Sequence, residues 1–251
     1  MSELMLFVIA AVFLLAGFVK GVIGLGLPTV SMGLLAVTIQ PSRALAIVIA
    51  PAIITNIWQT FSGPYLRGIL KRLWPLMLCT VIGSLMSAGA MSGPYARYGT
   101  IALGLLLVIY AAIGLSQFRL RVEPRDEKWV GGIVGLVTGV ISASTGVQVI
   151  PSMPFIQAIG MEKDELVQAL GVFFTVATLA LSVNVTSSGF LNATTAIPAA
   201  IALACSFAGM FIGQIVRSKM PTEAFRHWFL IAMILLGIYL AASAAYEVHV
   251  H

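Results

Sequence analysis

The sequence predicts an all-α polytopic membrane protein built of two repeats. Of its 251 residues, 59% are hydrophobic and 9% are charged, whereas soluble domains carry about 25% charged residues. The apolar segments approach 20 residues, which is the length of a membrane-spanning helix and too long for barrel strands. A charged segment divides the chain nearly in half, and similar features recur in the same order on either side of it.

The first half, residues 1–118, opens with a long apolar run at 4–39. As one helix this run would extend about 54 Å, against a hydrocarbon core of about 30 Å. We expect it to fold back within the glycine-rich stretch 17–28, because glycine and proline disfavour a helix. Three spans at 44–61, 73–91 and 100–116 complete this half.

A charged cytoplasmic linker, residues 119–128, leads into the second half, residues 129–251. This half opens with another long apolar run, at 129–159, which we expect to break at 139–146. The remaining spans are predicted at 166–185, 193–216 and 225–245, so each half has a broken first segment plus three helices. The whole chain then has about eight or more membrane segments.

Local matches between the halves indicate an internal duplication. Gly21-Val22-Ile23 matches Gly139-Val140-Ile141, and each triplet opens a predicted break. Cys79 and Gly83 also match Cys205 and Gly209 in their spacing. Shared lipid-facing composition is the alternative explanation.

The basic residues of the connecting segments orient the two repeats. If each broken run is a hairpin that returns to its starting face, all of them except Arg43 and Arg97 fall on one face, which the positive-inside rule places in the cytoplasm. The repeats are then inverted and both termini face outside. Simple spans would instead divide the charges almost evenly. The residues on the basic face are Arg67, Lys71, Arg72, Arg119, Arg121, Arg125, Lys128, Lys163, Arg217, Lys219 and Arg226.

Lys20 is the single charge within the first apolar run, and helix-breaking glycines flank it. A broken helix at membrane depth is tolerated only where protein or a water-filled cavity satisfies its backbone. We therefore interpret Lys20 as part of an anion site. The alternative is a surface anchor whose ammonium group reaches the interface.

Polar residues near the two breaks complete the predicted site. Asn56 and Gln59 share one face of the next helix, although an interhelical hydrogen bond also explains them. Trp58 is either a donor or part of the interfacial aromatic belt. The glycines expose half-helix N-termini to an anion or only let helices pack closely. The candidate substrate-binding residues are Lys20, Gly24, Gly26, Asn56, Trp58, Gln59, Ser142, Ser144, Thr145 and Gln148.

The composition also excludes several function classes. All nine acidic residues lie at termini or in predicted loops, which argues against cation transport and against a carboxylate proton relay. The two cysteines lie in separate apolar spans, so we expect neither a disulfide framework nor a metal site, and no cofactor. The spans lack paired carboxylates and a readable Ser/His pair, so an enzyme is not expected. The net charge of +5 belongs to loops and does not indicate nucleic-acid binding.

The stretch Gly17-Phe18-Val19-Lys20-Gly21-x-x-Gly24-x-Gly26-x-Pro28 resembles the first motif of the sulfite exporter TauE/SafE family, in the 4-toluene sulfonate uptake permease superfamily. Thr55-Asn56-Ile57-Trp58-Gln59 resembles the next helix of the same branch. The sequence departs from that pattern at Gly33, where proline is frequent, and at the hydroxyl residues of the second break, where glycines are common. The resemblance covers essentially the whole chain and implies movement of small sulfur-containing or organic anions such as sulfite and sulfonates.

We therefore expect a multi-pass secondary transporter of the inner (plasma) membrane that exports such anions by alternating access, with its site at the two breaks. An uptake permease for an organic anion is one alternative, and a non-transporting scaffold or channel subunit is another. The expected partners are a small anionic substrate and the lipid bilayer, without nucleic acid, and a homodimer is left open.

Overall fold

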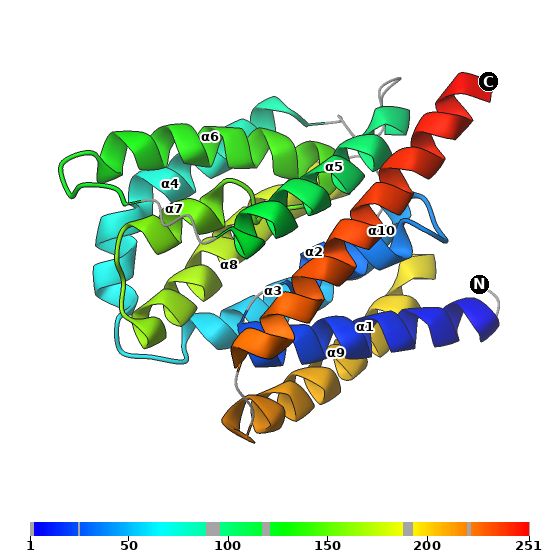
Figure 1. The fold of residues 1–251 in the computed structure, drawn as a ribbon, viewed down its shortest axis with the longest axis horizontal. Coiled ribbons are helices and arrows are strands. Elements are labelled where there is room, and N and C mark those ends of the chain that lie inside the picture. Colours follow the sequence, from blue (N-terminus) through cyan, green and yellow to red (C-terminus); the bar gives the residue numbers. More distant parts are fainter. Residues whose placement is uncertain are drawn as a thin grey trace.

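The computed structural model describes residues 3–24, 26–88, 96–116, 121–187, 193–219 and 222–250. Within these ranges the regular structure is all helical, which confirms the predicted class (Figure 1). Arg119 and Leu120 of the predicted linker lie outside the described residues. The helices are α1 (Glu3–Ile23), α2 (Leu27–Leu35), α3 (Pro41–Thr60), α4 (Leu66–Met86), α5 (Ala96–Leu115), α6 (Glu127–Thr145), α7 (Ser152–Ala158), α8 (Lys163–Ser187), α9 (Ala193–Lys219) and α10 (Thr222–Val250).

Six helices of the described chain, namely α1, α3, α4, α6, α8 and α9, are long and apolar enough to cross a membrane. Shorter apolar stretches lie in α5 and α10, at Gly99–Leu115 and Phe229–Ala245. In contrast, α2 and α7 have 9 and 7 residues, and helices of about 14 Å or less cannot cross a core of about 30 Å. Each of these short helices runs back along the bundle from the end of the long helix before it (Figure 1).

Both chain reversals begin at a glycine in the left-handed conformation. Gly24 follows α1 with φ 88°, and Gly146 follows α6 with φ 74°. The N–H of Gly24 donates to the carbonyl of Lys20 at 2.7 Å, and the N–H of Gly146 donates to the carbonyl of Ser142 at 2.8 Å. Glycine suits this helix-ending position because it has no Cβ to clash at positive φ.

The predicted break intervals began too early, because α1 continues through Gly17 and α6 continues through Gly139. These glycines serve close packing between helices. A Cβ on Gly17 would lie 2.2 Å from the carbonyl oxygen of Ser206 on α9, and one on Gly139 would lie 2.2 Å from the carbonyl oxygen of Thr80 on α4. Small residues at such contacts let helix backbones approach closely in membranes.

These contacts give another alignment of the two breaks. Thr80 follows Cys79 and Ser206 follows Cys205, so the two partner positions agree with the predicted cysteine match. In this alignment Gly139 falls on Gly17, one helical turn before the predicted Gly21. With this register the helix-ending Gly146 falls on Gly24, and the two left-handed glycines coincide.

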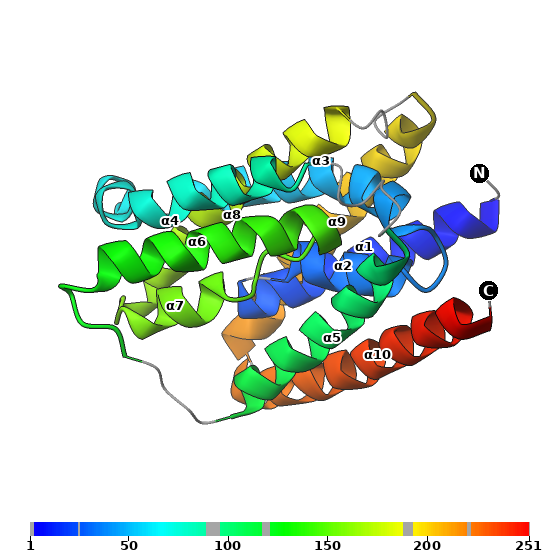
Figure 2. The ribbon, with the colours of Figure 1, turned by 90° about the horizontal axis from the view of Figure 1, so that it is seen from above.

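The long helices exchange partners between the halves of the chain. α1 packs on α9, α4 on α6, α3 on α8, and α5 on α10 (Figures 1 and 2). Both termini of the described chain lie at one end of the bundle (Figures 1 and 2). The opposite end holds the starts of α4, α6 and α8, and with them Arg67, Lys71 and Lys128. We call this opposite end the basic end.

Candidate functional site

Lys20 lies in the interior of the bundle, near the end of α1. Its exposed fraction is 4%, so the ammonium group does not act as a surface anchor. The Nζ atom donates to Thr55 Oγ1 at 3.0 Å and to Asn56 Oδ1, both on α3. The predicted proximity of Lys20 and Asn56 is thus present, and Thr55 joins them.

No ion pair of the described residues includes Lys20, since those pairs belong to Arg72 and Arg125. Among the side chains whose burial the structure describes, Lys20 is the only charged one that is buried. A buried ammonium group without a carboxylate loses hydration that neutral oxygens replace only in part. We use the name Lys20 pocket for the interior site formed by Lys20, Thr55 and Asn56. When Lys20 is protonated, its charge has no compensating carboxylate among the described residues.

Asn56 adds an unused donor to this pocket. Its side chain is 1% exposed, and its Nδ2 atom has no hydrogen-bond partner in the described structure. Because Lys20 can only donate, the amide oxygen of Asn56 must face Lys20 and the amide nitrogen must point elsewhere. A buried, unsatisfied amide is unusual, and a further acceptor beside it would satisfy its unused donor.

Gln59 lies on the same face of α3 but donates to the backbone. Its Nε2 atom bonds the carbonyl of Gly24 at 2.9 Å and the carbonyl of Val167 on α8 at 2.8 Å. Both hydrogens of this amide are therefore already used. Gln59 joins the first break to the second half of the chain, which is the interhelical role left open by the sequence.

Gln168 on α8 makes the reciprocal connection, and the sequence analysis missed it. Its Nε2 atom donates to the carbonyls of Thr60 at 2.8 Å and Gly63 at 2.7 Å, and its Oε1 atom accepts from the Tyr65 N–H at 2.8 Å. The hydroxyls of Thr60 and Thr175 lie 3.0 Å apart. We call Gln59, Thr60, Gln168 and Thr175 the polar brace. An amide inside the predicted apolar span 166–185 was the available signal for Gln168.

At the second break, the predicted hydroxyl donors bond their own helix. Ser142, Ser144 and Thr145 donate to carbonyls three or four residues earlier on α6, at 3.0, 3.1 and 2.8 Å. Gln148 is buried, and its Oε1 atom accepts from the Thr178 hydroxyl of α8 at 3.0 Å. Thr178 was not predicted.

The Lys20–Asn56 contact at the first break and the Gln148–Thr178 contact at the second lie at a similar depth in the bundle, within about one helical turn of each other. α3 and α8 run in opposite directions (Figure 1), and Thr60 meets Thr175. The backbone of Gly171 on α8 lies against Gln59 and Thr60, so Asn56, one turn earlier on α3, is level with the turn of α8 that carries Thr175. Thr178 lies about one turn farther from the basic end. The predicted glycines frame the first break beside this region, since Gly24 precedes it and Gly26 caps the start of α2.

The side chain of Trp58 points away from Lys20 and Asn56, toward the outside of the bundle. It is 57% exposed on the outer face of α3, together with Ile54 and Ile57 at 40% each. An apolar outer face of this kind suits contact with lipid. Trp58 therefore does not share the interior pocket of Lys20 and Asn56.

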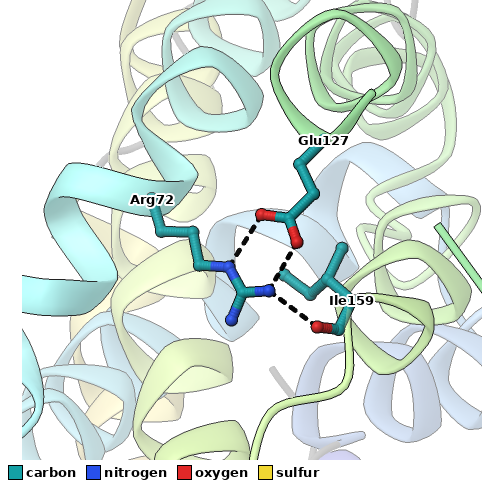
Figure 3. A network of polar contacts seen from close by, with 3 residues as sticks. All are labelled: Arg72, Glu127 and Ile159. Atoms are coloured by element: carbon teal, nitrogen blue, oxygen red, sulfur yellow. Dashed lines mark hydrogen bonds and ion pairs between the residues drawn. The ribbon is translucent and has the colours of Figure 1, made fainter. Parts of the chain in front are cut away.

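A charged cluster stabilises the basic end (Figure 3). The guanidinium of Arg72 on α4 donates to both carboxylate oxygens of Glu127 at the start of α6, at 2.8 and 2.5 Å, and to the carbonyl of Ile159 at 2.7 Å. The carboxylate also lies in the first turn of α6, where the helix dipole favours negative charge. This cluster fastens α4, α6 and the segment after α7 together.

The family model described as Sulfite exporter TauE/SafE matches residues 9–240. The chain belongs to the TauE/SafE family. The match covers both breaks and, at least in part, every helix that the structure describes, which confirms the resemblance seen in the sequence. No curated protein and no solved structure gives a significant match to the chain.

Membership in the TauE/SafE family makes this chain a membrane protein of a transporter family, and the family description names sulfite as the exported anion. This fits the expectation that the chain is not an enzyme. At Gly33, where the sequence departs from the family pattern, the backbone packs closely against two other helices. A Cβ there would lie 3.0 Å from side-chain carbons of Leu107 and Leu236, so α5 and α10 crowd this position.

Proposed function

We propose that this TauE/SafE protein is a secondary transporter that exports small sulfur-containing or organic anions, such as sulfite or sulfonates, across the inner membrane. The observation that carries the proposal is the buried Lys20, which has no carboxylate partner in the described structure. An anionic group beside its Nζ atom would compensate the charge. The unpaired Nδ2 of Asn56 would then donate a second hydrogen bond to the same group.

The first turn of α2 strengthens this assignment. Gly26 caps that helix, whose first hydrogen bond runs from the N–H of Val30 to the carbonyl of Gly26. The N–H groups before Val30 have no partner within the helix, and the helix start carries a partial positive charge. We assign Lys20, Asn56, Gly24 and Gly26 to the anion side of the site. Ser142, Ser144, Thr145 and Gln148 are proposed as its second-half wall.

The proposed mechanism is alternating access between two inverted repeats. Three observations support it: the exchanged helix partners, the matching left-handed glycines, and the similar depth of Asn56 and Thr178. Inverted repeats with broken helices are a recurring transporter design with the site near the midplane. The positive-inside rule puts the basic end in the cytoplasm, so an inside-negative potential favours export by about 2.3 kcal/mol per charge per 100 mV.

Anion flux in proteoliposomes tests this proposal. Sulfite, a sulfonate and a carboxylate are loaded in turn, with wild type, Lys20→Met and the matched control Lys71→Met, whose lysine is exposed at the basic end. We expect saturable flux of a sulfur anion by wild type and Lys71→Met, and its loss in Lys20→Met.

Other outcomes separate the alternatives. Saturable flux only under inward gradients would favour an uptake permease, and flux that does not saturate would favour a channel subunit. Absence of flux for every anion in both directions would refute transport of this substrate class and favour a scaffold. Equal flux by wild type and Lys20→Met would remove Lys20 from the site.

A further inference from the structure

The polar brace lies between the Lys20 pocket and the basic end. Gln59 is three residues beyond Asn56 on α3, which places it about 4.5 Å closer to that end. Thr60 and the loop residue Gly63, both bonded by Gln168, lie farther in the same direction. Any path from the basic end to Lys20 along the junction of α3 and α8 must therefore pass the brace.

The hydrogen bonds of the brace connect the two halves of the chain. Gln59 reaches from the first half to the carbonyl of Val167, and Gln168 reaches from the second half to the carbonyls of Thr60 and Gly63. Gln59 also bonds the carbonyl of Gly24, so the first break is fastened to the same junction. The brace thus fixes three segments that frame the pocket: the break, α3 and α8.

The corresponding positions at the other end are apolar. Val167 lies 3.7 Å from a Cβ added to Gly24, and Leu45 lies 3.3 Å from one added to Gly146. When Gly24 is aligned with Gly146, Val167 therefore takes the place of Leu45. The same alignment pairs Gln168 with Ala46, and Gln59 with Leu181. Ala46 and Leu181 are both 2% exposed, and neither side chain can make a hydrogen bond, so these two positions supply no counterpart to the brace.

We propose that Gln59 and Gln168 are positioning residues that close the Lys20 pocket on the basic side, and that the pocket opens to that side when their hydrogen bonds separate. This rests on the proposed transport function. Amide hydrogen bonds suit such a gate, because water replaces them with little net loss when it enters. Apolar contacts have no such replacement in water.

Labelling of a cysteine behind the brace tests the gate without a substrate. In a Cys79→Ser, Cys205→Ser background, Thr178→Cys places a thiol at a position that is 2% exposed and beyond the brace from the basic end. A membrane-impermeant maleimide is added from either side of oriented vesicles. Gln59→Leu and Gln168→Leu should each raise the labelling rate at least fivefold from the basic side and leave it unchanged from the other side.

Asn184→Leu is the matched control. Asn184 is another buried amide of α8, and it bonds Ser84 of α4 instead of the brace. It should leave labelling from the basic side at the level of the parent protein. An equal increase in the control, an increase from both sides, or no increase in the brace variants would each overturn the proposal.

A second variant locks the gate and does not depend on the folding of the leucine variants. The hydroxyls of Thr60 and Thr175 are 3.0 Å apart, so Thr60→Cys with Thr175→Cys brings two thiols within reach of each other. Oxidation should reduce anion flux at least tenfold, and a reductant should restore it. Undiminished flux through the oxidised pair would overturn the gate. Increased labelling in a protein that moves no anion would keep the gate and refute transport.

Discussion

The effect of Lys20→Met on the free energy of unfolding tests whether the Lys20 charge serves function or stability. Removing one member of a buried salt bridge destabilises a protein by about 3–5 kcal/mol, because the other charge is left buried and unpaired. Lys20 has only the neutral oxygens of Thr55 and Asn56. Lys20→Met removes an ion whose burial costs several kcal/mol. It also loses two charge-assisted hydrogen bonds of about 1.5–3 kcal/mol each.

These terms nearly cancel in the free energy of unfolding. We expect Lys20→Met to lie within about 2 kcal/mol of wild type, or roughly 4–8 °C in melting temperature at 2–4 °C per kcal/mol for this chain length. The side-chain carbonyl of Asn56 then loses its donor, which costs about 1–3 kcal/mol. Adding Asn56→Leu should recover that amount. The Thr55 hydroxyl keeps its bond to the carbonyl of Pro51 at 2.7 Å.

Anion-dependent melting provides the functional half of the assay. A substrate at 100 times its Kd stabilises the folded state by about 2.7 kcal/mol, or roughly 5–11 °C. Wild type and Lys71→Met should show this shift, and Lys20→Met should not. A Lys20→Met protein that keeps the anion-induced shift, or that loses more than about 4 kcal/mol, would refute the reasoning.

Three further predictions concern packing, the charged cluster and specificity. Gly139→Ala should destabilise the protein by about 1–3 kcal/mol because its Cβ meets the α4 backbone, whereas Gly68→Ala, with nothing within 4 Å, should gain up to about 1 kcal/mol; equal melting temperatures would contradict this contact. Glu127→Gln should cost about 1–2 kcal/mol and Arg72→Met a similar amount, less than a fully buried pair, because the Arg72 side chain is 32% exposed. Additive losses in the double variant would show that the two residues do not interact. A monoanionic sulfonate should inhibit transport at least about tenfold better than a dianion of similar size, since Lys20 supplies one positive charge and a second negative charge would remain buried and unpaired. Equal inhibition would refute charge selection by Lys20.

The broad architecture could be predicted from hydropathy and glycine content. The all-helical class, the two reversals and the concentration of basic residues follow from run lengths and charge positions alone. The limits of the breaks could not be predicted, because Gly17 and Gly139 stay helical through contacts with helices far away in sequence. The predicted apolar span 73–91 also missed the start of α4 at Leu66, because Arg67, Lys71 and Arg72 lower the hydropathy of this segment although lysine and arginine favour a helix.

The candidate site was predictable in type but not in detail. A lysine among helix-breaking glycines and an amide on the next helix indicated Lys20 and Asn56, and the structure brings them together. Spacing alone cannot say which face of α3 packs inward, so Trp58 was grouped with residues from which it points away. Gln59 and Gln168 required tertiary information, because the partners of both are backbone carbonyls that every sequence contains.

The packing of helices from one half against helices from the other affects the order in which the chain can fold as it is synthesised. α1 is synthesised first, yet the helix on which its glycine face packs is α9, which is made near the end. Contacts so distant in sequence form slowly, and the α1–α9 contact cannot form until most of the chain has been made. A gene that encoded only one half would leave the glycine faces of α1 and α4 without partners. Two copies of such a half could supply those faces to each other.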